Sequence, residues 1–252
     1  MSHDVIKFDL CCAARVLFRA GLSVANAGHL SLTVAENTML VNRFGPSFAT
    51  LTPADILTVD YSGTVLEHDP KVSPYVNDTI HLHGVIHRYN PEIVAVVHTH
   101  PPATVTFSAF RKLPEIYDQE SCILAGDIGI VDEDYSGLAA SEERVRATAV
   151  ELGKHRAVIL PNHGAITTGP NIQLATFAMM LLEGMVQRNL AVAATARATG
   201  LPPKPISTEH ALTAKREIAR IPFLQPLWED LLQRLRQTDP GLFAHAPKAP
   251  TA

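Results

Sequence analysis

Apolar residues recur at helical spacing over several stretches of the chain and alternate with short β-branched runs. The spacing predicts helices at residues 5–22, 78–89, 103–111, 142–152, 172–199, 208–220 and 222–236. Runs bounded by Gly, Pro, Asn and Ser predict strands at residues 30–34, 39–41, 56–59, 65–67, 93–97 and 157–160, and another ending at 168. Helices and strands therefore mix along the whole chain, which predicts an α/β fold.

Two of these runs are typical of strands buried on both faces. Residues 93–97 are apolar without interruption and mostly β-branched, and residues 157–160 form a second such run. The first ends in His98-Thr99-His100 and two prolines, and the second in Pro161-Asn162-His163-Gly164. Because proline cannot continue a strand ladder, these polar residues lie where each strand leaves the sheet.

Composition favours a compact protein. The 252 residues are 46% apolar, which is enough for a sizeable core. We find no repeat, no low-complexity linker and no change of composition along the chain. We therefore expect a single domain at residues 1–243 and a disordered tail at residues 244–252, which contains two prolines.

The charges and cysteines exclude several classes of function. There are 21 Lys and Arg against 25 Asp and Glu, without a basic run, so the sequence lacks the electrostatic footprint of nucleic-acid or anionic-membrane binding. The N-terminus has no secretory signal pattern, and no apolar stretch is long enough to span a bilayer. Three cysteines make a poor disulfide framework, so we expect them reduced. We expect a cytoplasmic protein that acts on a small molecule.

Histidines supply the strongest chemical signal. His98 and His100 are two positions apart on an extended segment, so both imidazoles project from the same face. If the two buried strands adjoin, His163 joins them, and three imidazoles leave positions open on a metal ion for a substrate or water. An isolated His-x-His pair is also compatible with satisfied core or surface histidines.

Longer segments resemble a known superfamily. The segments GVIHRYNPEIVAVVHTHPPATVTFSA from Gly84 and AVILPNHGAITTG from Ala157 resemble the class II aldolase/adducin superfamily, which contains aldolases, epimerases and metal-dependent decarboxylases. AGHLSL and LTPADILTVDYSG occur in the matching order. The resemblance implies a three-layer α/β/α sandwich with a central, mostly antiparallel sheet. It also implies that His98, His100 and His163 bind a divalent metal (Zn, Mn or Fe), and that the protein is a homotetramer.

One departure from the superfamily pattern bears on the substrate. Sugar-phosphate aldolases carry Ser-Ser-Glu where this chain has Asn77, Asp78 and Thr79. Their catalytic carboxylate is therefore missing or replaced by Asp78, which would repel a phosphate dianion. We expect a substrate without phosphate and name Asp78 and Tyr135 as candidate catalytic proton donors. The acidic loop around Tyr135 is equally compatible with plain solvated surface.

Candidate substrate-binding residues are His29, Arg43, Phe44 and His83. The guanidinium of Arg43 is suited to a carboxylate, although an exposed loop charge explains it equally well. Phe44 is available to stack on an aromatic ring. His83 and His87 are one helical turn apart, and we favour satisfied polar residues over metal ligands for this pair.

Three functions remain open. The first is a metal-dependent carbon–carbon lyase, a decarboxylase above all, for an aromatic or 2-oxo/2-hydroxy carboxylic acid. The second is an Fe(II)- and O2-dependent oxidative decarboxylase of a hydroxyphenylpyruvate- or mandelate-type acid, because VNDTIHLHG and LVNRFGPSF resemble the aminocoumarin-pathway branch of the superfamily. The third is a non-catalytic scaffold of the adducin type. The three histidines argue against the scaffold, because it has no need of them.

Overall fold

The computed structural model describes residues 3–131, 137, 141–220 and 222–247. In the described chain, the strands form an eight-stranded sheet in the order β4-β3-β2-β1-β5-β8-β7-β6. Their bounds are β1 His29–Ala35, β2 Thr38–Asn42, β3 Ile56–Asp60, β4 Val65–Glu67, β5 Ala95–Thr99, β6 Ile128–Ile130, β7 Ala157–Leu160 and β8 Gly164–Gly169. The β6–β7 pair is parallel and the other neighbouring strands pair antiparallel, as the resemblance implied.

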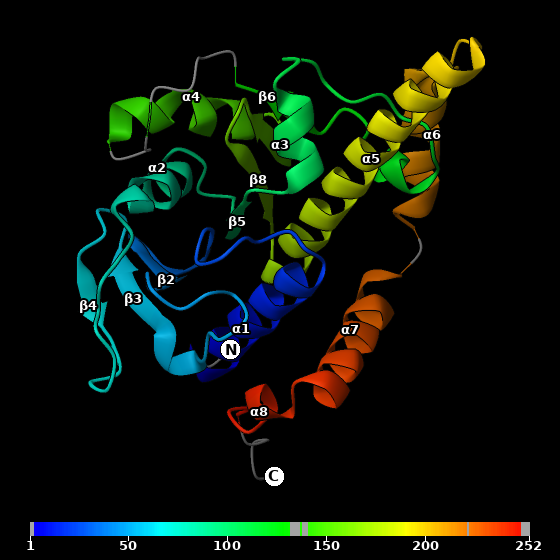
Figure 1. Cartoon of the computed structure of the whole chain (residues 1–252). Coiled ribbons are helices and arrows are strands. Elements are labelled where there is room, and N and C mark those ends of the chain that lie inside the picture. Colours follow the sequence, from blue (N-terminus) through cyan, green and yellow to red (C-terminus); the bar gives the residue numbers. More distant parts are fainter. Residues whose placement is uncertain (1–2, 132–136, 138–140, 221, 248–252) are drawn as a thin grey trace.

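Helices cover both faces of this sheet. Their bounds are α1 His3–Arg19, α2 His81–Tyr89, α3 Pro102–Ser108, α4 Glu142–Leu152, α5 Ile172–Thr199, α6 Thr208–Ile218, α7 Leu224–Thr238 and α8 Pro240–Phe243. Helices α1 and α5 lie against one face, while α2 and α4 lie against the other (Figure 1). The fold is therefore the expected α/β/α sandwich.

Alternation along the central strand divides the core into two layers. In β5, Ala95 and Val97 pack with the cluster formed by α1 and α5, whereas Val96 packs with α2 and α4. His98 continues the alternation on the side of Val96 and is 2% exposed. This alternation turns the first histidine of the motif toward α2.

The long helix α5 follows the predicted bounds because both of its ends have clear signals. The Asn171 side chain accepts the backbone N–H of Leu174 at 2.8 Å, which caps the N-terminus. At the other end Gly200 has a φ of 71°, the left-handed conformation that glycine adopts without a Cβ penalty.

Some elements differ from the prediction. The sequence predicted no helix or strand between residues 111 and 142, but Ile128–Ile130 forms the edge strand β6 beside β7. The central strand begins at Ala95 rather than Ile93, and the short helix α8 was not predicted. The backbone N–H groups of residues 244–246 donate to α8, so this part of the expected tail is folded against it, while residues 248–252 lie outside the described residues. Within the described part of the chain, no helix is long and apolar enough to cross a membrane.

Candidate metal centre

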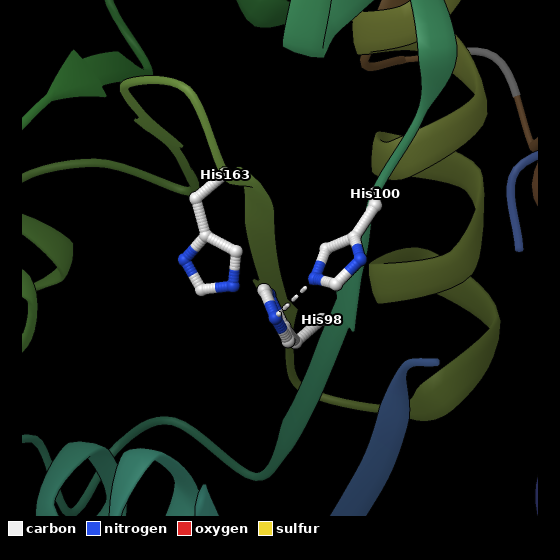
Figure 2. A group of neighbouring side chains, drawn as sticks. All are labelled: His98, His100 and His163. Carbon is white, nitrogen blue, oxygen red and sulfur yellow. Dashed lines mark hydrogen bonds between the residues drawn. The ribbon is translucent and has the colours of Figure 1, made fainter. Parts of the chain in front are cut away.

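Three histidine side chains converge at one end of the sheet. His98 is on β5, His100 follows β5, and His163 lies in the turn between β7 and β8. Their imidazoles point toward one another (Figure 2), and one ring nitrogen from each lies within 4.8 Å of the other two. The structure thus brings together the three residues that the sequence predicted to meet.

Strand pairing explains why these distant residues meet. β5 pairs antiparallel with β8, and Thr99 faces Ala165. The approach is close at Gly164, where a Cβ would lie 2.4 Å from the carbonyl oxygen of Thr99 and 2.7 Å from Cδ2 of His100. A side chain at position 164 would therefore displace the strand end that carries the His-x-His pair.

The hydrogen bonds of His98 suit a metal ligand. Its Nδ1–H donates to the carbonyl oxygen of Ala165 at 3.0 Å, which leaves the lone pair of Nε2 directed at the site. The Nε2 atoms of His98 and His100 are 3.2 Å apart. Two ligand nitrogens of a tetrahedral zinc site, with bonds of about 2.0–2.1 Å, are about 3.4 Å apart. Donor type, tautomer and spacing therefore fit a divalent metal held by three imidazoles.

Burial keeps these imidazoles neutral, which is the form that binds metals. Loss of solvent around His98 holds its pKa well below 6.5, and the neighbouring histidines lower it further. Burial also lowers the pKa of His163 to about 4 and, to a smaller extent, the pKa of His100. No proton has to be removed from these residues near neutral pH before a cation can bind.

A cavity of about 300 Å³ opens beside the three histidines. Phe44 and Tyr75 lie on its wall and meet edge to face, with ring centroids 5.7 Å apart. Asp78 lies on the same wall and accepts a hydrogen bond from the Tyr75 hydroxyl at 3.2 Å. Among the described residues that line the cavity there is no lysine or arginine. The cavity therefore combines a candidate metal site of three histidines, an aromatic wall and one carboxylate.

His29, Phe44 and Asp78 line this cavity, together with the three candidate metal ligands. His29 pairs with His98 across β1 and β5 and is 7% exposed. Tyr135, the other candidate catalytic residue, lies outside the described residues.

Arg43 and His83 lie elsewhere. The Nε of Arg43 donates to Asp55 at 2.7 Å, and Arg43 does not line the cavity. His83 is fully buried behind His29, with its Nε2 3.0 Å from Nδ1 of that residue. Neither side chain is placed to touch a ligand in the cavity, so their expected contact with substrate has no support in this geometry.

The structure adds residues that the sequence did not single out. Tyr75 reaches the cavity from a loop without periodicity, so no sequence pattern marked it. Thr79 also lines the cavity, and its hydroxyl is 2.9 Å from Nε2 of His29. Ser31 is fully buried between His83 and His87, with its hydroxyl at 2.6 Å from the first and 2.8 Å from the second. The alternation of AGHLSL, which puts His29 and Ser31 on one face of a strand, was the available signal.

Comparison with known proteins agrees with the observed fold. Residues 8–190 match the family model of the class II aldolase and adducin N-terminal domain. The chain belongs to this family.

Relatives within the family carry different activities in their names. The chain is 31% identical to 4-hydroxy-3-prenylphenylpyruvate oxygenase/4-hydroxy-3-prenylbenzoate synthase of Streptomyces roseochromogenus subsp. oscitans, over 97% of this chain and 87% of that protein. It is also 31% identical to decarboxylase NovR of Streptomyces niveus, over 98% of this chain and 89% of that one. Among solved structures, L-fuculose 1-phosphate aldolase from Glaciozyma antarctica PI12 superimposes with a TM-score of 0.81 at 26% identity, covering 93% of this chain and 91% of the other. The aminocoumarin-type resemblance noted in the sequence is thus confirmed at the level of similarity.

Proposed function

We propose that the protein is a metal-dependent carbon–carbon lyase that decarboxylates a carboxylic acid without phosphate, of the aromatic or 2-oxo/2-hydroxy type. The observation that carries the proposal is the convergence of His98, His100 and His163 at the wall of a cavity that also holds an aromatic pair and a carboxylate. A family member that serves only as a scaffold has no use for this set of neutral imidazoles.

We assign each residue of the site a role from its position in the cavity. The three histidines hold a divalent cation, which when bound stabilises negative charge on an oxygen next to the carbon that loses its substituent. Phe44 and Tyr75 contact an aromatic ring of the substrate. Asp78 and the Tyr75 hydroxyl, hydrogen-bonded to each other, hold a proton at the cavity wall for the carbon that must be protonated after the bond breaks.

The cavity supports an acid without phosphate. A phosphate dianion would meet the Asp78 carboxylate, and the described cavity wall supplies no lysine or arginine to offset it. A single carboxylate, by contrast, has the cation at the histidine corner as its partner. The similarity to decarboxylase NovR supports a carboxylic acid as the substrate.

A second candidate is an oxidative decarboxylation that uses Fe(II) and O2. It is favoured by the similarity to 4-hydroxy-3-prenylphenylpyruvate oxygenase/4-hydroxy-3-prenylbenzoate synthase. Three imidazoles are compatible with iron, zinc and manganese, and the ligand types alone do not choose among them. The metal found in the purified protein therefore separates the two candidates. The homotetramer and the cytoplasmic location stay predictions.

Elemental analysis of anaerobically purified protein tests the proposal. About one Zn or Mn per chain, lost in His98→Ala and kept in His210→Ala, would support the lyase; His210 is exposed on α6, away from the site. Stoichiometric Fe, with oxygen uptake on addition of an aromatic 2-oxo acid, would support the oxygenase instead. Protein that binds none of these metals would contradict both.

Asp78→Asn tests the pair formed by Asp78 and Tyr75. We expect product formation to fall about a hundredfold, which is typical of the loss of an acid–base group, while the metal content stays at the wild-type level. Asp69→Asn is the matched control, because Asp69 is a loop carboxylate that is not part of the cavity wall. Near-full turnover in Asp78→Asn would remove this residue from the mechanism.

A further inference from the structure

A second cavity lies between α5, α6 and the start of α7, and its volume is about 450 Å³. It is larger than the cavity of about 300 Å³ beside His98, and the two have no lining residue in common. Volumes of this size are typical of small-molecule sites. Helices α6 and α7 follow the segment 8–190 that matches the family model, so the second cavity is formed in part by residues outside that match.

The walls of the second cavity are mostly apolar. Phe177 of α5 and Phe223, which precedes α7, both line it, with ring centroids 5.4 Å apart. Leu174, Leu181 and Ile218 belong to the same wall. Water in such a space has few hydrogen-bond partners, so an apolar group that displaces it gains free energy. The body of a matching ligand is therefore apolar, and two phenyl rings are available to contact an aromatic one.

Different partners hold α6 and α7 in place. Ala211 of α6 is buried in a small cluster with Cys122 and Ala125. Trp228 and Leu235 of α7 are instead buried in the main core cluster, to which α1 and α5 contribute. Each helix thus buries its apolar residues without the other. The space between them is therefore preformed and does not have to be opened by a ligand.

Two cations approach each other at the wall of the second cavity. The Nζ atom of Lys215 donates to the Asp127 carboxylate at 2.6 Å and to the carbonyl oxygen of Ala125 at 2.8 Å. The Nε atom of Arg156, which also lines the cavity, lies 3.9 Å from the same Asp127 oxygen, and the Arg156 side chain is 40% exposed. The described lining residues include no Asp or Glu. One carboxylate therefore faces two cations, and one positive charge is left unbalanced.

We propose that the second cavity binds a small amphipathic monocarboxylate, with its apolar body against Phe177 and Phe223 and its carboxylate at Arg156. A planar guanidinium is suited to two parallel hydrogen bonds with a carboxylate. The ammonium of Lys215 has a third hydrogen beyond the two that it donates to Asp127 and Ala125. A neutral apolar molecule would match the walls but cover two cations without an anion. The site needs no metal and does not depend on the proposed lyase activity.

Calorimetry with 4-phenylbutyrate and the uncharged 4-phenylbutanol tests the proposal on the full-length protein. EDTA treatment leaves the carboxylate no metal to bind beside His98, so binding to the treated protein reports on the second cavity. We expect the acid to bind about tenfold more tightly than the alcohol, because only the acid accepts charge-assisted hydrogen bonds. A site of the same affinity should be present in the zinc-loaded protein.

Three variants assign the binding to these residues. Arg156→Gln should weaken the acid about tenfold and leave the alcohol unchanged. Arg197→Gln is the matched control, because it removes the same charge from an exposed side chain of α5 that does not line the second cavity. Phe177→Ala should weaken the acid and the alcohol by similar factors, because it removes an apolar contact that both ligands make.

Several outcomes would overturn the inference. One is acid binding that Arg156→Gln and Arg197→Gln reduce equally, and another is acid binding that Phe177→Ala leaves at the wild-type affinity. A treated wild type that does not bind the acid would also contradict it. If Phe177→Ala then sediments at a lower mass than wild type, a second copy of the chain covers this apolar face instead. None of these results changes the metal analysis, which tests the proposed lyase separately.

Discussion

At the residue scale, the orientation of the His163 side chain depends on the backbone conformation of the preceding residue, Asn162. Asn162 has a φ of 56°, the left-handed region in which asparagine is tolerated better than most side chains. Its backbone N–H donates to the hydroxyl of Ser108 at 2.9 Å, which ties the turn to α3. This turn is what reverses the chain between β7 and β8 and directs the third imidazole at the other two.

The left-handed conformation of Asn162 predicts different effects for two substitutions at this position, one that tolerates the conformation and one that does not. Asn162→Gly should keep both the unfolding free energy and the metal affinity near wild type, because glycine adopts this φ freely. Asn162→Ala should lower the unfolding free energy by about 1 kcal/mol and weaken metal binding, because alanine disfavours the same φ. Urea denaturation and zinc titration of the two variants measure the difference. If alanine and glycine behave alike, the conformation of Asn162 does not set the position of His163.

The sequence could identify the candidate metal ligands but not the hydrogen-bonded residues behind them. His98, His100 and His163 were found because each follows a buried strand, a pattern visible in one dimension. The links among His29, Ser31 and His83 depend on which helix covers which face of the sheet, which no local pattern specifies. The ion pair between Arg43 and Asp55 was hidden for the same reason: the partner lies on another segment.

At the scale of elements, the start of α3 depends on a carboxylate from α5. Glu183 is 3% exposed and accepts the backbone N–H groups of Ala103 and Thr104, each at 2.9 Å, and the Thr104 hydroxyl at 2.7 Å. These N–H groups belong to the first turn of a helix and have no partner within it. The same turn follows His100 directly, so Glu183 fixes the strand exit that carries a candidate metal ligand.

Glu183→Gln should therefore affect both stability and the site. One amide oxygen cannot replace two carboxylate oxygens, so we expect the unfolding free energy to fall by about 2–3 kcal/mol and zinc to bind more weakly. Gln187→Ala is the control: it removes only the 3.3 Å contact of an exposed side chain with Glu183. Thermal unfolding measures the change in stability, and zinc titration measures the change in metal affinity. A Glu183→Gln variant with wild-type stability would mean that solvent satisfies the first turn of α3.

Elements with strong local signals were predicted closely, and short edge elements were not. Residues 142–152, 157–160 and 172–199 have the predicted bounds, because periodicity, caps and bounding turns agree there. The edge strand β6 was missed because three residues in a polar segment show no alternation and depend on β7 for their pairing. The central strand was placed two residues early, since the Ile93 carbonyl is occupied by His87 rather than by a neighbouring strand.

At the scale of the molecule, the layer between the sheet and α2 contains buried polar side chains that are hydrogen-bonded to one another. His83, His87 and Ser31 are each at most 1% exposed, yet every one of their polar side-chain atoms has a hydrogen-bond partner. Such satisfied networks fix one arrangement of a core, because each alternative leaves a buried group without a partner. The cost is sensitivity to acid, since these histidines are buried in the neutral form.

This sensitivity predicts how stability depends on pH. In the unfolded chain a histidine titrates at 6.5, whereas burial lowers the folded pKa of His87 and His163 to about 4 and of His29 to about 3. Below pH 6.5 the unfolded state binds protons that the folded state does not. Stability is therefore complete above this pH and decreases as the pH falls toward 4, by roughly 1.4 kcal/mol per pH unit for each such histidine.

Chemical denaturation of EDTA-treated protein between pH 7.5 and 4.5 measures this slope without competition from a metal. His87→Gln should reduce it, because the glutamine amide can donate to the Ile93 carbonyl and accept from Ser31 but does not titrate in this range. The slope should decrease by nearly the contribution of one histidine. The unfolding free energy near neutral pH should change less than the unfolding free energy at pH 5. A slope equal to that of wild type would show that His87 is not held neutral by burial, and that acid unfolding begins elsewhere in the molecule.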